Sequence, residues 1–234
     1  MPPAYKNQKS RILIFDVNET LLDIQALQPF FTDCFGDATV LKEWFAQTLL
    51  YSQTVTITDT YTDFSNIARL ALEMTARRHA VQCSDPVMKG LLDAMLNLPA
   101  HPDVAGALRR LREHGFRLFT LTNSAPAVLQ SQIKAAGLAT LFEGLFSVDA
   151  VRKFKPHPAP YRYVADGLRV QAQELTMIAA HPWDLIGAKA VGYKVAFVER
   201  AHAAWFQLTP RPKISGDTLD EIADLLIFET DGGL

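Results

Sequence analysis

The sequence is poor in cysteine, has no excess of basic residues and contains no long hydrophobic run. Its 234 residues include only Cys34 and Cys83, too few for a disulfide framework, so we expect a reduced, cytoplasmic setting. The formal net charge of −2 argues against a broad basic surface for nucleic acid. No apolar stretch approaches membrane-spanning length, and residues 1–10 lack the apolar core of a signal peptide. The sequence therefore predicts neither a nucleic-acid partner nor a membrane partner.

Short, uniformly apolar segments recur along the chain and are typical of strands that are buried on both faces. They cover residues 12–15, 117–122, 175–180 and 194–198. Helical patterns lie between or after them, at residues 104–115, 161–168, 184–192 and 216–226. Strands that alternate with helices indicate βαβ units, so we expect an α/β fold with a doubly wound parallel sheet.

Residues 24–98 have a different pattern, with no comparable strand segment. Three helical stretches fill most of this part, at residues 41–53, 61–80 and 85–98. In the second stretch, apolar residues recur at helical spacing, which we interpret as packing between helices; they are Phe64, Ile67, Ala68, Leu70, Ala71 and Met74. We therefore expect a core formed by residues 1–23 and 99–234, with a helical subdomain of residues 24–98 inserted after the first strand.

Polar residues follow the predicted strands, where an open α/β sheet binds its ligands. Asp16 comes directly after the first strand, and Thr122 and Asn123 end the second. Lys155 lies in a loop after Val148, and His181 and Asp184 follow the strand that ends at residue 180. A lysine near Asp16 would keep it ionised. An ionised carboxylate can attack a substrate and form an ester, which water then hydrolyses.

Each of these residues also has a purely structural explanation. Asp16 and Asp184 could each cap a helix, and Thr20 could brace its loop. Asn123 could be a turn residue, His181 a packed loop histidine, and the lysine an ordinary solvated side chain. The convergence of four separate segments on one edge of the sheet favours a chemical site.

Four motifs in this order resemble the haloacid dehalogenase superfamily, from Arg11 to about Leu226. They are FDVNET at residues 15–20, LTN at 121–123, FKP at 154–156 and WD at 183–184. The resemblance implies that Asp16 is the nucleophile and that residues 24–98 form a cap that closes over the cleft. Phosphatases of the superfamily usually have a second Asp where this chain has Asn18, and an acidic residue where it has Ala180. Both differences remove groups that a magnesium phosphatase needs.

More specifically, the chain is similar to the type II 2-haloacid dehalogenases. The local matches are KPHPAPY at residues 155–161, SVDAV at 147–151, the Trp183-Asp184 pair, and Trp44, residues 50–52 and Phe64 in the cap. The resemblance implies a hydrolase without metal or cofactor: Asp16 displaces halide from a small 2-haloacid, and hydrolysis of the ester releases the 2-hydroxy acid. It also implies a homodimer formed through the cap helices.

The chain departs from this family at several positions. Phe45 stands where the family usually has an Arg that helps to take the departing halide. Ala179 and His181 replace a Ser and an Asn that help to place the hydrolytic water, and Asn18 and Thr122 replace a Tyr and a Ser. We therefore expect water activation to shift to His181, whose neutral imidazole is a competent base near neutral pH.

These observations predict two groups of site residues. The catalytic group is Asp16, Lys155, Asp184, His181 and Thr20. The substrate-binding group comprises the backbone amides of Val17 and Asn18 together with Thr122 and Asn123 for the carboxylate, and an apolar pocket of Phe45, Leu49, Phe64 and Trp183.

Two alternatives stay open at this point. A phosphatase acting on a small phosphate ester is the first. A non-catalytic binding protein on the same fold is the second; Phe45 and Ala179 favour it, whereas the intact Asp16, Lys155 and Asp184 argue against it.

Overall fold

In the central sheet, successive strands of the chain lie on one side of β1 up to β3 and on the other side from β4 onward. A computed structural model describes residues 11–82, 85–201, 203–230 and 232. Its sheet has six parallel strands in the order β3-β2-β1-β4-β5-β6. They are β1 (Ile12–Phe15), β2 (Arg117–Thr122), β3 (Gly144–Ser147), β4 (Leu175–Ala179), β5 (Lys194–Val198) and β6 (Ile214–Gly216). The predicted doubly wound sheet is confirmed, and the carboxyl end of β1 lies at its topological switch point.

The two edge strands, β3 and β6, were not predicted from the sequence. In β3 only Ser147 is fully buried, and β6 has three residues of which only Gly216 is buried. Short, half-buried edge strands lack the uniform apolar run that identifies a central strand. The last helix also differs from its predicted range, because Gly216 belongs to β6 and α9 runs from Leu219 to Thr230.

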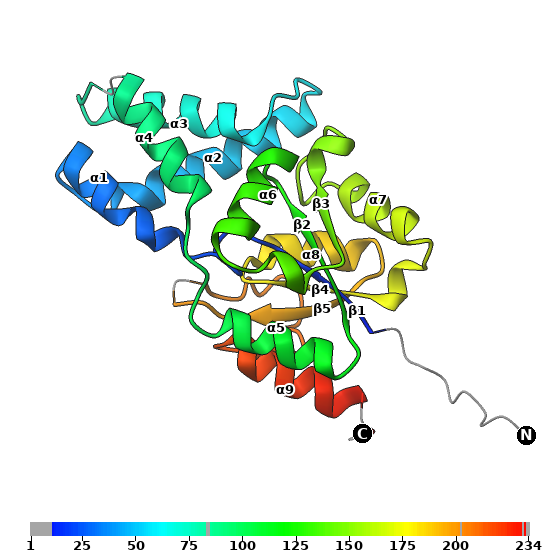
Figure 1. Ribbon diagram of the computed structural model, residues 1–234. Coiled ribbons are helices and arrows are strands. Elements are labelled where there is room, and N and C mark those ends of the chain that lie inside the picture. The colour runs from blue at the N-terminus through cyan, green and yellow to red at the C-terminus, as the bar shows by residue number, and fades with distance from the viewer. Residues whose placement is uncertain (1–10, 83–84, 202, 231, 233–234) are drawn as a thin grey trace, which may run out of the picture.

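Helices cover both faces of the sheet. They are α5 (Val104–Glu113), α6 (Pro126–Ala135), α7 (Pro158–Leu168), α8 (Pro182–Ala190) and α9, with short 3₁₀ turns η2 (Ala139–Leu141), η3 (Val148–Ala150) and η4 (Ala172–Glu174). Helices α5 and α9 lie side by side, as do α7 and α8 (Figure 1). The apolar stripe of α5, which comprises Val104, Ala107, Leu108 and Leu111, is buried. That spacing is typical of a helix with one face in the core.

The helices between β1 and α5 form a group of their own beside the sheet (Figure 1). They are η1 (Ile24–Leu27), α1 (Gln28–Phe35), α2 (Val40–Ile57), α3 (Phe64–Arg78) and α4 (Asp85–Leu96). Helices α2 and α3 pack closely, and the buried Trp44 donates its indole N–H to the carbonyl of Ala68 at 2.8 Å. Most of the α3 stripe is buried as expected, but Leu70 is 46% exposed and points away from the core.

Two linkers connect this helical group to the sheet and lie next to each other. The backbone N–H of Asp23 donates to the carbonyl of Pro99 at 2.8 Å, and that of His101 donates to Leu21 at 2.9 Å. A second set of contacts lies at the far end of α2. Lys153 donates to the carbonyl of Thr56 at 2.8 Å and forms an ion pair with Asp59. These contacts hold the helical group against the loop that precedes Lys155.

Among the residues that the structure describes, no helix combines the length and the apolarity that crossing a membrane requires. The predictions for Cys83 and residues 1–10 concern positions outside the described ranges.

Candidate active site

Asp16 occupies the first position after β1. Its backbone N–H donates to the carbonyl of Ile178 in neighbouring β4 at 3.0 Å, so the main chain is fixed up to this residue. The chain then turns back at once, because the amides of Leu21 and Leu22 both donate to the carbonyl of Val17. The Asp16 side chain is only 7% exposed. This geometry presents a buried carboxylate at the carboxyl edge of the sheet.

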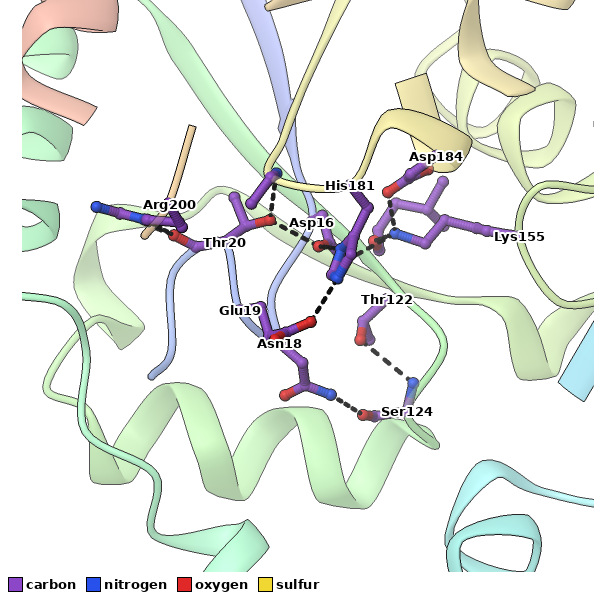
Figure 2. A network of polar contacts seen from close by, with 12 residues as sticks. Asp16, Asn18, Glu19, Thr20, Thr122, Ser124, Lys155, His181, Asp184 and Arg200 are labelled. Atoms are coloured by element: carbon purple, nitrogen blue, oxygen red, sulfur yellow. Dashed lines mark hydrogen bonds and ion pairs between the residues drawn. The ribbon is translucent and has the colours of Figure 1, made fainter. Parts of the chain in front are cut away.

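Lys155 binds one oxygen of that carboxylate. Its Nζ lies 2.9 Å from Asp16 Oδ1, 2.6 Å from Asp184 Oδ2 and 2.8 Å from the carbonyl of Leu121 (Figure 2). An ammonium group has three protons, and these three acceptors account for all of them. The lysine is 1% exposed. Burial opposes its charge, but the two carboxylates raise the pKa of Lys155, so the ammonium form is favoured.

Asp184 and Tyr161 complete this buried side. The Tyr161 hydroxyl donates to Asp184 Oδ1 at 2.7 Å. Burial raises the pKa of Asp184, and the nearby charge of Asp16 raises it further, whereas Lys155 opposes the shift. Burial also raises the pKa of Tyr161, which therefore stays a hydrogen-bond donor.

Thr20 and His181 bind the other oxygen of Asp16. The Thr20 hydroxyl donates to Asp16 Oδ2 at 2.7 Å and accepts from the backbone N–H of Ala180 at 2.9 Å. Burial alone would raise the pKa of Asp16. The charge of Lys155 and the hydrogen bonds from His181 and Thr20 outweigh it and hold that pKa well below its usual range. Asp16 is therefore ionised at neutral pH.

His181 lies between two carboxylates. Its Nδ1 is 3.1 Å from Asp16 Oδ2, and its Nε2 is 2.7 Å from Glu19 Oε2 (Figure 2). Burial disfavours the charged ring, but the hydrogen bonds to Asp16 and Glu19 raise the pKa of His181 to about 10. In the free protein these contacts favour the imidazolium, whereas the sequence-based prediction that His181 activates water needs the neutral ring; the sequence did not reveal the contact with Glu19.

Two aromatic rings flank His181. The ring centroid of Phe45 lies 6.4 Å from that of His181, and the ring of Trp183 lies 5.0 Å away. Phe45 belongs to α2 and Trp183 to α8, so the histidine is enclosed by both parts of the molecule. An imidazolium next to aromatic faces gains electrostatic stabilisation.

The other two predicted apolar residues, Leu49 and Phe64, belong to α2 and α3. Phe64 is 4% exposed and lies 6.0 Å, centroid to centroid, from Phe154, the neighbour of Lys155 in the chain. Leu49 is partly buried and packs against the core one turn after Phe45.

The predicted carboxylate-binding side chains gather at the end of β2. The hydroxyl of Thr122 accepts from the backbone N–H of Ser124 at 3.2 Å, which leaves its own proton for a bound group. Asn123 Oδ1 accepts from the backbone N–H of Lys155 at 3.1 Å, and the Asn123 NH₂ group takes no part in this contact. The Asn18 side chain instead bonds to Ser124 at 3.3 Å and Gln132 at 3.2 Å, so it is held within the protein.

Sequence reasoning did not assign a role to three residues that contact the site. Tyr161 lies in the KPHPAPY segment that carries the family resemblance, and this was a usable signal. Glu19 lies in the first motif, but its partner His181 is 162 positions away. Arg200 donates to the carbonyl of Thr20 at 2.9 Å and pairs with Asp103 at 2.7 Å, thereby fixing the loop from outside.

A cavity of about 510 Å³ lies next to His181 and Glu19. Its lining includes the charged or titratable side chains of Asp23, His101, Arg200 and Asp217. The Oδ2 side of Asp16 therefore adjoins an open space through His181.

The fold thus places a buried carboxylate beside a lysine at the switch point of a parallel sheet. The chain belongs to the haloacid dehalogenase-like hydrolase family, whose model matches residues 11–192.

Named relatives agree with this assignment. Haloacetate dehalogenase H-2 of Moraxella sp. is 29% identical, with 94% of this chain and 99% of the relative covered. (S)-2-haloacid dehalogenase 1 of Pseudomonas sp. is 31% identical over 81% of this chain and 85% of the relative. The structure of L-2-haloacid dehalogenase from Xanthobacter autotrophicus superposes with a TM-score of 0.87 at 26% identity, covering 92% of this chain and 98% of the other.

Proposed function

We propose that this protein hydrolyses small 2-haloacids to 2-hydroxy acids through a covalent ester on Asp16. The observation that carries the proposal is the contact of Asp16 with Lys155 at 2.9 Å in a buried site, which keeps the carboxylate ionised without solvent. A desolvated carboxylate is a stronger nucleophile than a hydrated one. The relatives named above act on substrates of this class according to their names.

The reaction has two steps. In the first, an oxygen of Asp16 attacks the carbon that bears the halogen, and halide leaves with the bonding electron pair. In the second, water attacks the ester carbonyl carbon and releases the 2-hydroxy acid, which restores the Asp16 carboxylate. Lys155 stays bound to Asp184 throughout and keeps the local charge balanced.

The substrate would be held at both of its ends. We assign its carboxylate to Thr122, Asn123 and the amides of Val17 and Asn18, since Val17 follows Asp16 in the chain and Asn123 binds the backbone N–H of Lys155. The apolar remainder would lie against Phe45, Leu49, Phe64 and Trp183. Thr20 acts by orienting Asp16, because its only proton is donated to Oδ2.

The phosphatase alternative has less support at the positions that distinguish it. The Asn18 side chain is bonded to Ser124 and Gln132 instead of facing a leaving group. Ala180 contributes a backbone N–H to Thr20 and has no side-chain oxygen for a cation.

The test is halide release from chloroacetate and 2-chloropropionate, measured with and without EDTA, beside hydrolysis of p-nitrophenyl phosphate with and without magnesium. We expect halide release that survives EDTA and disappears in Asp16→Asn. Turnover of the phosphate ester alone, dependent on magnesium, would establish the phosphatase. No turnover of either substrate would favour the binding protein.

We further propose that residues 24–98 act as the cap over this site, supported by the adjacent linkers at Asp23 and Pro99. A homodimer through α2 and α3 is supported by an apolar groove of about 220 Å³ that is lined by Tyr51, Val55, Ile67, Leu70 and Met74, among others. Sedimentation of the protein and of Leu70→Glu tests it, with a dimer expected only for the former. A cytoplasmic location fits the free thiol of Cys34.

A further inference from the structure

Glu19 occupies a backbone conformation that a residue with its side chain rarely adopts. Its φ is +63°, in the left-handed region that favours glycine. The backbone is held there on both sides: the Glu19 N–H donates to the carbonyl of Leu22 at 2.8 Å, and His101 Nε2 lies 3.1 Å from the Glu19 carbonyl oxygen. Such strained positions cluster at functional sites.

The strained backbone directs the Glu19 carboxylate at His181. The contact of 2.7 Å joins Glu19 Oε2 to Nε2, the ring nitrogen that points away from Asp16. The other nitrogen, Nδ1, lies 3.1 Å from Asp16 Oδ2, the oxygen that does not touch Lys155 (Figure 2). Glu19 therefore determines both the orientation of the ring and the nitrogen that keeps its proton.

We propose that Glu19 is a positioning residue for the second step: it holds the Nε2–H of His181 so that Nδ1 is the base for the water that attacks the Asp16 ester. The inference rests on the proposed function and extends it to a residue with no assigned role. A carboxylate that orients an imidazole and stabilises its protonated form is the arrangement that hydrolases with a histidine base use.

The proton transfers balance over the cycle. After halide has left, Asp16 is a neutral ester, and His181 releases its Nδ1 proton to solvent. Water then attacks the ester carbonyl carbon while Nδ1 takes one of its protons. The tetrahedral intermediate breaks its bond to the alkyl oxygen, and that oxygen receives the proton from Nδ1 to form the 2-hydroxy acid. The new Asp16 carboxylic acid passes its proton to Nδ1, which restores the original ion pair.

The charges around His181 explain why it changes its protonation state at the right moment. Asp16 and Glu19 contact it directly, and both raise its pKa in the free protein. Other titratable or charged groups surround the adjacent cavity or lie beyond Asp16: Asp23, His101, Arg200, Asp217, Lys155 and Asp184. Ester formation removes the charge of Asp16, so the pKa of His181 falls, while Glu19 remains to stabilise the imidazolium that forms during water attack.

The experiment separates the two steps by rapid-quench kinetics with 2-chloropropionate. In Glu19→Gln we expect first-turnover halide release within about twofold of the wild type, and hydrolysis of the ester slowed at least about tenfold, because a general base contributes about 10²- to 10⁴-fold. The alkylated protein should accumulate and be visible by intact mass. Asp217→Asn, which removes another carboxylate from the lining of the same cavity, is the matched control and should leave both steps unchanged.

The pH profile distinguishes positioning from loop bracing. Ester hydrolysis should rise with pH as His181 loses its proton, and Glu19→Gln should move this rise to lower pH because the neutral amide no longer favours the imidazolium. A residue that only braced the loop would slow both steps equally and leave the pH profile in place, and this result would overturn the proposal.

A second variant guards against misfolding. Glu19→Gly suits the left-handed backbone, so relief of backbone strain offsets part of the lost contact with His181 and the protein should stay folded in the assay, which its melting curve checks. It should nevertheless accumulate the ester. Unchanged ester hydrolysis in a well-folded Glu19→Gly protein would also overturn the proposal while leaving the dehalogenase function intact. Absence of halide release from the wild type itself would reject the proposed function and this inference together.

Discussion

The two oxygens of Asp16 lie in different surroundings. Oδ1 faces Lys155, which is bound in turn to Asp184, and both partners are at most 1% exposed. Oδ2 faces Thr20 and His181, and His181 leads through Glu19 to a cavity of about 510 Å³. One side is sealed within the core, and the other adjoins space that solvent can enter.

The two surroundings of Asp16 affect two different properties: the ionisation of Asp16 and the proton affinity of His181. In the proposed mechanism, the sealed side keeps Asp16 ionised before it attacks, and Lys155 retains Asp184 as a partner once Asp16 has become an ester. On the open side, His181 loses one of its two carboxylate partners at that moment and retains only Glu19. A change in the charge of Asp16 is therefore converted into a change in the proton affinity of His181, while Lys155 stays charged.

The largest effect is expected on the sealed side. Lys155→Met leaves Asp16 and Asp184 buried without their shared cation, so kcat/KM for 2-chloropropionate should fall about 1,000-fold or more. The free energy of unfolding should fall by about 3 kcal/mol, because removal of one partner leaves buried charges unpaired. Halide assays and urea denaturation measure the two effects.

Lys153→Met is the matched control for that variant. Lys153 is 21% exposed and its ion-pair partner Asp59 is 80% exposed, so its loss should cost less than about 1 kcal/mol. Similar losses in the two variants would contradict the distinction between the sealed network and the surface contacts of the helical group.

His181, on the open side, should make the free energy of unfolding fall as pH rises above neutral. The pKa of His181 lies near 10 in the folded protein, above the 6.5 of an ordinary histidine. Its contribution is therefore complete below about pH 6.5 and is lost as pH rises toward 10. Between pH 7 and 9 this amounts to about 1.4 kcal/mol per pH unit, because only the folded state holds the proton.

His181→Asn isolates this contribution, since the other titrating groups are common to both proteins. The free energy of unfolding of the wild type should decline more steeply between pH 7 and 9 than that of the variant. Parallel declines would show that His181 is neutral in the folded protein.

The smallest expected effect concerns the energetic coupling between Phe45 and His181. A guanidinium at position 45 would lie beside the imidazolium, so Phe45→Arg alone should lower kcat/KM for 2-chloropropionate. In the His181→Asn background the repulsion is absent, and the same substitution should be neutral or favourable. A double-mutant cycle should give a coupling of about 1 kcal/mol. Strict additivity would mean that the two positions act independently.

The site residues that could be predicted from sequence are those that follow a predicted strand or lie in a short motif. The central strands are uniformly apolar, so the ends of β1, β2 and β4 were identifiable, and with them Asp16, Thr122 and Asp184. Lys155 could be found because it lies in a motif of fixed order.

The remaining features depend on three-dimensional contacts. The edge strands β3 and β6 are too exposed to carry a uniform apolar signal, and β6 has only three residues. Leu70 fits the helical period of the buried α3 stripe but is exposed. The charge of His181 could not be predicted because it depends on Glu19, and no periodicity or motif links residues 162 positions apart.

The most direct test of the central claim is a single turnover in ¹⁸O-labelled water with protein in excess over 2-chloropropionate. Attack by Asp16 predicts that the product carries unlabelled oxygen and that the label enters the carboxylate of Asp16, where peptide mass spectrometry would locate it. Label in the first product molecule, with none in Asp16, would show that water attacks the substrate directly and would contradict the ester mechanism.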